Sequence, residues 1–211
     1  MEGKKTHSNI RLIQQGAEAK IFLDEKNNLI IKDRISKSYR IKELDSKIIK
    51  QRTKAEKKLL EKASKIIDSP NPLPLKDANI IKMPYIDGER LSEILNNFTI
   101  ERQKQIMKNV GESTSKLHKE YIIHGDLTTS NMILVEDKVF FIDFGLGYIS
   151  RKIEDKAVDI HLLKQALEAK HFQNWKVLFE EFKKSYSRDY PESKHIFERI
   201  IAVEKRGRYR H

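Results

Sequence analysis

One pattern constrains the fold of this chain more than any other: His124-Gly125-Asp126-Leu127-Thr128-Thr129-Ser130-Asn131, followed by Asp143-Phe144-Gly145. Asp126 and Asn131 stand five residues apart on one expected loop, and Asp143 follows twelve residues after Asn131 at the end of an apolar run. An isolated Asp or Asn often only caps a turn. The complete pattern at this spacing instead indicates a fold that brings the three side chains together at one cleft.

Apolar periodicity and turn residues predict a strand-rich first part and a mostly helical second part. Strands are expected on both sides of a turn at Gly16 (residues 9–23), at 29–32, near Leu75, at 79–83, and as a pair at 131–135 and 139–143. Helices are expected at about 41–67, 91–96, 99–119, 155–170, 173–187 and 193–204.

This order predicts an α+β fold of two lobes with a cleft between them. Residues 1–86 would form a small, β-rich N-lobe, an antiparallel sheet with one long helix. Residues 87–204 would form a reduced, mostly helical C-lobe that carries the 124–131 loop, and residues 205–211 a basic C-terminal tail. The hinge is expected near residues 84–88, at the Asp87-Gly88 turn.

The charge balance favours anionic partners. Lysine and arginine total 42 against 31 acidic residues, which gives a formal net charge of +11. Such a surface attracts nucleic acid, nucleotide phosphates or an acidic protein face. A low-GC genome also fills surface positions with lysine, so composition alone leaves both interpretations open.

Composition also excludes several classes of protein. The chain has no cysteine, which excludes disulfide scaffolds and thiolate metal sites. Residues 1–7 carry no apolar signal core, and no apolar run is long enough to span a bilayer. We therefore expect a cytoplasmic protein without a membrane partner. Because Met1 stands just before the first expected strand, we also expect an unfused chain.

Phosphoryl transfer would use these residue types at this spacing. The reaction needs neutralised phosphates, bound metal and an aligned acceptor hydroxyl, and little covalent help. Asp126 would accept or orient the acceptor proton, while Asn131 and Asp143 would supply the hard oxygen ligands that Mg²⁺ prefers. We therefore expect ATP as the nucleotide and Mg²⁺, or Mn²⁺, as the metal.

A second group of candidates lies in the expected N-lobe. Lys32 ends an apolar run and could hold the inner phosphates if Glu56, on the long helix, fixed its ammonium. Each residue could also be an ordinary surface charge, with Glu56 paired to Arg52. Their order relative to the 124–131 loop favours the functional interpretation.

The remaining nucleotide contacts have weaker signals. The turn Gly16-Ala17-Glu18-Ala19 retains only the middle glycine of a glycine-rich loop, so a plain hairpin is an equal alternative. Met83, Tyr85 and Ile86 stand at the hinge, where backbone groups could bind adenine. His124 and Asp159 are expected to give structural support. Asp159 should open the first helix after residue 145 and accept hydrogen bonds from amides of the 124–131 loop.

Together these residues resemble the protein-kinase superfamily, from about Gly16 to Asp159, and the resemblance implies a protein-kinase-like, two-lobed fold. A finer resemblance rests on seven runs: 16–19, 32–40, 44–45, 52–56, 124–131, 156–159 and 206–208. They are similar to the small atypical serine/threonine kinase subunits of the KEOPS (EKC) complex, which are relatives of the RIO kinases. The resemblance covers nearly the whole chain.

This resemblance implies a serine/threonine kinase or ATPase that supports formation of threonylcarbamoyladenosine (t6A) at position 37 of tRNAs decoding ANN codons. The implied partners are the sugar-kinase-like subunit that transfers the threonylcarbamoyl group, which in some archaea shares one polypeptide with the kinase, and the other KEOPS subunits. The tail arginines Arg206, Arg208 and Arg210 would engage that subunit, tRNA, or both. A disordered solubilising end is the alternative.

One departure from ordinary protein kinases is visible in the sequence. Only fifteen residues separate Asp143 from Asp159, and no Ala-Pro-Glu motif lies between them. A long activation loop with a peptide-docking platform cannot fit there. Autophosphorylation, one docked partner, or hydrolysis of ATP by water fits better.

Two other functions remain open. A small-molecule phosphotransferase of the aminoglycoside or choline type also uses an HGDL…N pattern, but it would need a larger helical lobe. A non-catalytic scaffold that binds tRNA and a partner would tolerate loss of Lys32, Asp126, Asn131 and Asp143, all of which are present.

Overall fold

The computed structural model describes residues 9–74, 77–188 and 190–207. The strand expected near Leu75 lies outside these residues, as do Arg208, Arg210 and the side chain of Arg206. The role expected of the tail therefore stays a prediction.

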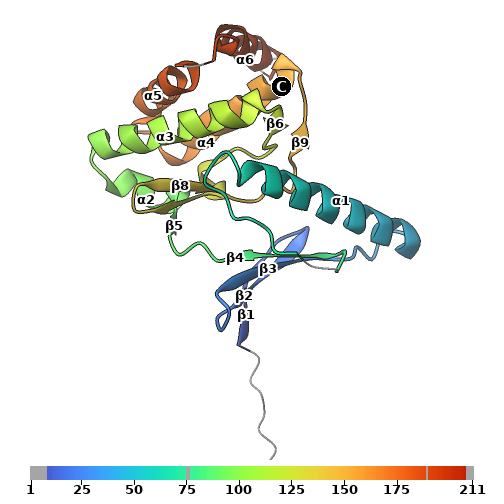
Figure 1. The fold of residues 1–211 in the computed structure, drawn as a ribbon. Helices are drawn as coiled ribbons and strands as arrows, with labels where there is room; N and C mark the ends of the chain where they lie inside the picture. The colour runs from blue at the N-terminus through green and yellow to red at the C-terminus, as the bar shows by residue number, and fades with distance from the viewer. Residues whose placement is uncertain (1–8, 75–76, 189, 208–211) are drawn as a thin grey trace, which may run out of the picture.

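A four-stranded antiparallel sheet forms the first part of the molecule, in the order β1-β2-β3-β4 (Figure 1). Its strands are β1 (Ile10–Gln15), β2 (Ala19–Asp24), β3 (Leu29–Arg34) and β4 (Ile80–Pro84). The predicted turn at Gly16 joins β1 to β2, where the Gly16 amide donates to the Ala19 carbonyl at 2.9 Å. Strand β3 runs two residues further than expected, so both Lys32 and Arg34 belong to it.

Helix α1 (Lys42–Ala63) lies between the sheet and the rest of the molecule (Figure 1). Its core-facing apolar residues come mainly from its second half: Leu59, Leu60 and Ala63 are nearly inaccessible. Leu44 and the preceding Ile41, which belong to the same apolar pattern in the sequence, are 52% and 71% exposed. The helix ends at Ala63, before the expected residue 67, and the 64–67 segment continues as a turn.

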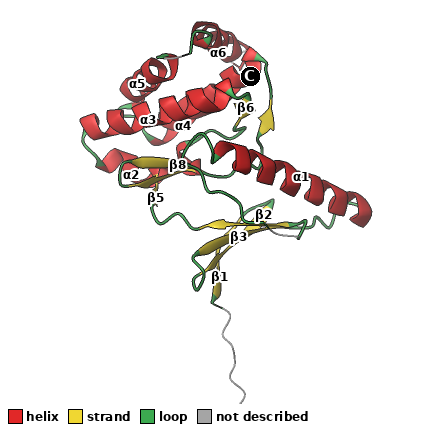
Figure 2. Ribbon diagram, viewed as in Figure 1, coloured by secondary structure: helices red, strands yellow, loops and turns green. Residues whose placement is uncertain are grey.

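The second part contains most of the helices, as Figure 2 shows. Its elements are β5 (Glu89–Arg90), α2 (Leu91–Ile94), η1 (Leu95–Asn97), α3 (Ile100–Lys119), β6 (Ile122–Ile123), η2 (Thr129–Asn131), β7 (Met132–Val135), β8 (Lys138–Phe141), β9 (Tyr148–Ile149), α4 (Ile153–Lys170), α5 (Trp175–Ser187) and α6 (Ser193–Gly207). Antiparallel β7 and β8 form the predicted strand pair, and β5 joins its free edge. We call β1–β4 with α1 the β-lobe, and the elements from β5 to α6 the helical lobe.

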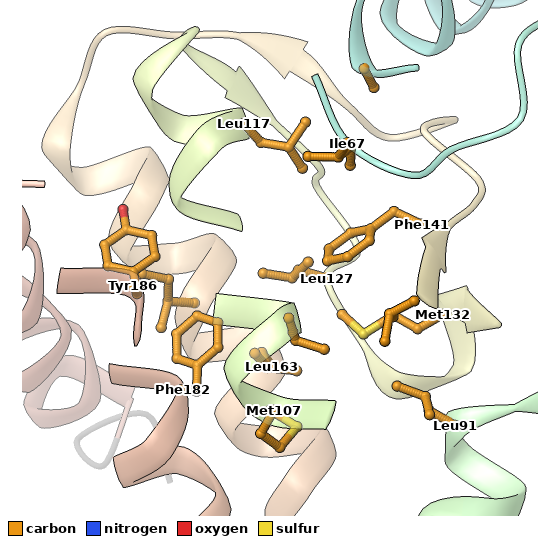
Figure 3. Close-up of a cluster of buried hydrophobic side chains, with 14 of the residues drawn as sticks. Ile67, Leu91, Met107, Leu117, Leu127, Met132, Phe141, Leu163, Phe182 and Tyr186 are labelled. Atoms are coloured by element: carbon orange, nitrogen blue, oxygen red, sulfur yellow. The ribbon is translucent and has the colours of Figure 1, made fainter. Parts of the chain in front are cut away.

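One apolar core joins the 124–131 loop to the helices beneath it. Figure 3 shows Leu127 from that loop among Met107 of α3, Leu163 of α4 and Phe182 of α5. All four side chains have at most 1% of their surface exposed. Because interiors are close-packed, this core restricts movement of the loop that carries Asp126 and Asn131.

The α+β, two-lobed arrangement agrees with the expectation from the sequence, whereas the domain boundary at residues 86 and 87 stays a prediction. Three two-residue strands, β5, β6 and β9, were not expected. In the part of the chain that the structure describes, no helix combines the length and apolar content needed to cross a bilayer.

Gly111 tests the packing of α3 against α5. A Cβ added at Gly111 would lie 2.1 Å from Ser185 Oγ and 2.6 Å from the Phe182 carbonyl oxygen. We predict that Gly111→Ala lowers the free energy of unfolding by about 1–3 kcal/mol, because overpacking outweighs the better helix propensity of alanine. Gly16→Ala is the matched control, since its nearest neighbour would lie 3.7 Å away. Equal urea midpoints for the two variants would contradict the close helix contact.

Candidate active site

The first of two adjoining cavities between the lobes has a volume of about 350 Å³. Its walls are largely apolar on the β-lobe side and at the hinge, and Lys32, Asn131 and Asp143 supply polar groups from both lobes. The expected hinge residues Met83, Tyr85 and Ile86 all line it. A largely apolar cavity with a few convergent polar groups is typical of a small-molecule or cofactor site.

The second cavity, of about 230 Å³, lies under the β1–β2 turn. All four expected loop residues, 16–19, line it. Asp126 faces the same space, and Lys32 and Asp143 line both cavities. The residues predicted from widely separated parts of the sequence therefore meet in one continuous cleft.

Lys32 is the central cation of this cleft. Its Nζ donates to Glu56 Oε1 at 2.6 Å and to Asp143 Oδ1 at 2.7 Å. Burial alone would lower the pKa of Lys32, but the negative charges of Glu56 and Asp143 outweigh burial and raise the pKa above its ordinary value. The ammonium therefore stays charged and is held between a helix of one lobe and a loop of the other.

Asp143 is held as a carboxylate by the same contact. Partial burial works against its charge, but Lys32 and the Gly145 amide, 3.1 Å from Asp143 Oδ1, lower its pKa below the ordinary value. Its backbone has a φ of +62°, a left-handed conformation uncommon for a residue with a side chain. The side chain is 49% exposed, so its Oδ2 can reach a ligand in the cleft.

Asp126 and Asn131 contact each other directly. The Asn131 Nδ2 donates to Asp126 Oδ2 at 2.8 Å and to the Asp126 carbonyl at 3.0 Å. These bonds orient the Asn131 amide, and its Oδ1 is the atom suited to a cation. His124 lies beneath them with a neutral ring, because burial lowers its pKa. Its Nδ1 accepts from the Asp126 amide at 3.3 Å, and its Nε2 donates to the Ile142 carbonyl at 3.1 Å.

The loop backbone is bound by Asp159. This buried carboxylate accepts from the His124 amide at 2.8 Å and the Gly125 amide at 2.9 Å, the hydrogen bonds expected from the sequence. Helix α4 begins at Ile153, so Asp159 lies in its second turn and does not open the helix as expected. A favourable interaction with the helix dipole therefore does not explain this acid.

Gly125 satisfies two backbone requirements at this point. Its φ is +81°, and a Cβ there would lie 2.2 Å from the Leu146 carbonyl oxygen. Only glycine combines that conformation with so close an approach. The segment after Asp143 thus packs directly on the 124–131 loop.

The hinge offers fewer backbone groups than expected. The Tyr85 amide already donates to the Asn28 carbonyl at 3.0 Å. Of the Tyr85 and Ile86 amides, only that of Ile86 has no hydrogen-bond partner among the described residues, so the contact expected of Tyr85 reduces to its carbonyl group. Both residues line the cavity.

Three polar contacts of the cleft were missed in the sequence. Arg34 donates from Nη2 to Glu56 Oε2 at 2.6 Å. Its position two residues after Lys32, on the same strand face, was the available signal. Arg90 bridges the lobes, from Nη2 to Gln14 Oε1 at 2.8 Å and from Nη1 to the Ser130 carbonyl at 3.0 Å. No local pattern indicates that bridge.

The third missed contact supports the loop from below. Thr129 Oγ1 lies 3.1 Å from Nε2 of the buried His171, whose Nδ1 lies 2.7 Å from Asn96 Oδ1. Burial, with a smaller contribution from Lys170, lowers the pKa of His171 to about 4. A neutral ring that donates to Asn96 and accepts from Thr129 fits this environment.

Comparison with known proteins places this cleft in a family. The RIO domain family matches residues 20–159. The KEOPS complex subunit Bud32 of Pyrococcus abyssi is 45% identical over 213 residues, which cover 95% of this chain and 97% of that protein. The chain belongs to the RIO domain family.

Two further relatives differ in how much of their own length this chain covers. A probable serine/threonine-protein kinase BUD32 homolog of Archaeoglobus fulgidus is 36% identical over 92% of this chain and 94% of the relative. A probable bifunctional tRNA threonylcarbamoyladenosine biosynthesis protein of Methanosarcina barkeri is 35% identical, and the match covers 94% of this chain but 35% of that longer protein. The protein-kinase-like fold class and the RIO relationship expected from the sequence are confirmed.

His171, which lies after the residues matched by the RIO domain family, gives this protein a pH-dependent stability. Its pKa is lowered in the folded state, so the unfolded state binds the proton first as pH falls below about 6.5, and stability is lost down to about pH 4. We predict that His171→Gln makes the loss of unfolding free energy between pH 7 and pH 5 smaller by about 2 kcal/mol. Burial also lowers the pKa of His124, so its protonation destabilises the folded state as the pH falls. This second histidine keeps part of the pH dependence in both the wild type and His171→Gln.

Urea unfolding at the two pH values measures this difference. His195→Gln is the matched control, because His195 is 68% exposed and pairs only with the exposed Glu198 among the contacts described. Parallel pH dependence in the wild type and His171→Gln would contradict the buried neutral ring.

Proposed function

We propose that this RIO domain protein is an ATP- and Mg²⁺-dependent phosphotransferase, a serine/threonine kinase or ATPase, that serves as an accessory subunit in t6A modification of tRNA in the cytoplasm. One observation carries the enzymatic part: Lys32, Asp126, Asn131 and Asp143 line two adjoining cavities of one cleft. A decayed nucleotide site in a scaffold protein would have no reason to keep Lys32 paired with two acids.

The residues present fit a nucleotide with a divalent cation. Asn131 Oδ1 and Asp143 Oδ2 are hard oxygen ligands of the kind that Mg²⁺ prefers, and the apolar first cavity suits adenine. Mn²⁺ takes similar ligands. Such a metal, when bound, would offset the negative charge of the phosphates.

The side chains of the chain then have distinct tasks. Lys32 binds phosphate oxygens, and Glu56 keeps its ammonium in position from α1. Asp126 orients an acceptor hydroxyl or water through Oδ1, because its Oδ2 is occupied by Asn131. Asp159 and His124 hold the loop so that Asp126 keeps this orientation. Positioning and electrostatics of this kind supply most of the catalysis in phosphoryl transfer.

The acceptor is restricted by the segment after Asp143. This segment forms the two-residue β9, paired with β6, and leads into α4 at Ile153. Its packing on Gly125 leaves no room for a long activation loop between these elements. Phosphorylation of itself or of one docked partner, or hydrolysis of ATP by water, therefore fits better than phosphorylation of many peptides.

The role in tRNA modification is supported by the relatives. One is named a subunit of the KEOPS complex, and a longer one is named a probable bifunctional tRNA threonylcarbamoyladenosine biosynthesis protein. We infer that the partners of this chain are other KEOPS subunits, in particular the sugar-kinase-like threonylcarbamoyltransferase. Contact with tRNA would be indirect or through the arginines of the tail.

The decisive experiment follows the γ-phosphate of labelled ATP. Transfer is measured to water, to the protein itself, to the transferase subunit and to a panel of aminoglycosides and sugars, with and without tRNA. Transfer to a small molecule alone would replace the proposal with a small-molecule phosphotransferase. Absence of nucleotide binding with Mg²⁺ present would favour the scaffold.

Asp126 tests the catalytic assignment. We predict that Asp126→Asn lowers the rate of ATP turnover by about 10²–10⁴-fold, because a positioned acid or base contributes roughly that factor. Asp137→Asn, a change in an 81% exposed turn residue of the same lobe, is the matched control and should keep the wild-type rate. Thermal melting of both variants would test whether each is folded. Turnover of Asp126→Asn equal to that of the control would remove Asp126 from the mechanism.

A further inference from the structure

Arg34 lies at the end of the cleft that is farthest from the hinge. On β3 it follows Lys32 by two residues and pairs in register with Ala19, at the start of β2 beneath the β1–β2 turn. Lys32 lines both cavities, whereas Arg34 lines only the second, together with Asp126. Strand β3 thus directs two cations into the cleft. Arg34 is the one that lies at the end where Asp126 would orient the acceptor.

The guanidinium of Arg34 is buried but incompletely paired. Its side chain is 5% exposed. Nη2 donates to Glu56 at 2.6 Å, Nη1 lies 3.6 Å from Glu18 Oε2, and Nε has no hydrogen-bond partner among the described residues. A guanidinium has five N–H donors, and a buried donor without a partner costs free energy. Arg34 thus has capacity for an additional anion.

Arg34 and Lys32 lie around the same point of the backbone. A Cβ on Gly145 would be 3.4 Å from Arg34 Nη2 and 3.4 Å from Lys32 Nζ. Gly145 follows Asp143 by two residues. The two cations therefore face the same space beside Asp143, one on the hinge side and one on the side of Asp126.

Glu18 lines the second cavity and is the third acid near these two cations, after Glu56 and Asp143. It belongs to the β1–β2 turn, its side chain is 49% exposed, and its Oε2 is shared between Arg34 and Arg52. The hydrogen bond from Arg52, followed by the charges of Arg52, Arg34 and Lys37, outweighs partial burial and lowers the pKa of Glu18. An exposed carboxylate on a turn can leave a contact of 3.6 Å at little cost.

We propose that Arg34 binds the terminal phosphate of the nucleoside triphosphate, and that Glu18 occupies this cation until the nucleotide replaces it. The proposal rests on the proposed function, since it assigns one end of the same nucleotide site. Arginine forms strong hydrogen bonds to phosphate, and Nη1, which lies 3.6 Å from the replaceable Glu18, is the donor that the phosphate would take. Exchange of one carboxylate for one phosphate leaves the buried Glu56 paired throughout.

Binding of the terminal phosphate by Arg34 can be distinguished experimentally from a role in which Arg34 only positions Glu56. A residue that only positions Glu56 and Lys32 affects a diphosphate and a triphosphate alike, because Lys32 serves both. A residue that binds the terminal phosphate affects the triphosphate alone. The ratio of the two affinities is therefore the informative quantity, and it needs no turnover.

Calorimetric titration with Mg²⁺ measures the affinities for ADP and for a non-hydrolysable ATP analogue. We expect Arg34→Met to weaken binding of the analogue by about tenfold or more, the value of a hydrogen bond to a charged group, and to change ADP binding less than twofold. Arg34→Lys should recover part of the loss. Glu18→Gln should strengthen analogue binding roughly two- to fivefold, because the competing carboxylate is removed.

Arg40→Met is the matched control. Arg40 also pairs with a buried carboxylate of α1, Asp45, at 3.2 Å, but it lines neither cavity. We expect this control to keep the wild-type ratio of the two affinities. Thermal melting with each nucleotide accompanies all variants, and Glu18→Gln provides a test on an exposed side chain if Arg34→Met is unstable.

Each outcome decides between the possibilities. Equal weakening of ADP and the analogue in Arg34→Met, or no change in Glu18→Gln, overturns the assignment and leaves Arg34 as a structural partner of Glu56. Failure of the wild type to bind either nucleotide overturns the proposed function itself. Selective loss of the analogue in Arg34→Met, with a gain in Glu18→Gln, supports the assignment.

Discussion

The buried carboxylate of Glu56 determines the geometry of the cleft. It is 1% exposed, and each of its oxygens accepts a hydrogen bond at 2.6 Å from a cation of β3, one from Lys32 and one from Arg34. Loss of either cation would leave one oxygen of this buried carboxylate without its hydrogen-bond donor, which destabilises the fold. This requirement fixes the position of α1 relative to β3. Since Lys32 also contacts Asp143, it holds the segment after β8 against the β-lobe.

Asp159 has the corresponding place in the helical lobe. Like Glu56, it is a buried acid on a helix. Asp159 binds backbone amides of the 124–131 loop, whereas Glu56 binds side-chain cations. His118, whose ring lies 3.1 Å from Asp159 and 2.9 Å from the Tyr186 hydroxyl, connects it to α5. In each lobe, one buried carboxylate on a helix therefore fixes the position of a group that lines the cleft: Glu56 fixes Lys32, and Asp159 fixes the 124–131 loop. The cleft is rigid where these carboxylates act and adjustable at the exposed Glu18.

Much of the architecture and of the candidate site could be predicted, because both have local signals. The Gly16 turn, the long α1 and the β7–β8 pair follow from apolar periodicity and turn residues, and the 124–131 loop follows from its pattern. The exposed Leu44 shows the limit, since periodicity reports amphipathicity and not what covers each face. The two-residue strands β5, β6 and β9 exist only through pairing with distant segments, so no local signal predicts them.

The sequence by itself determined which residue types were available and in what order: an acid and an amide on one loop, a second acid after a strand pair, and a lysine on an early strand. The tertiary structure decided which partners those residues have. Lys32 contacts Asp143 across 111 positions of the chain, and Arg90 contacts Gln14 across 76. Contacts of this kind depend on how helices and sheets pack, which is set by the whole core and not by neighbouring residues. The spacing of Lys32 and Arg34 could suggest a shared strand face, but only the folded chain shows that Arg34 Nε has no hydrogen-bond partner among the described residues.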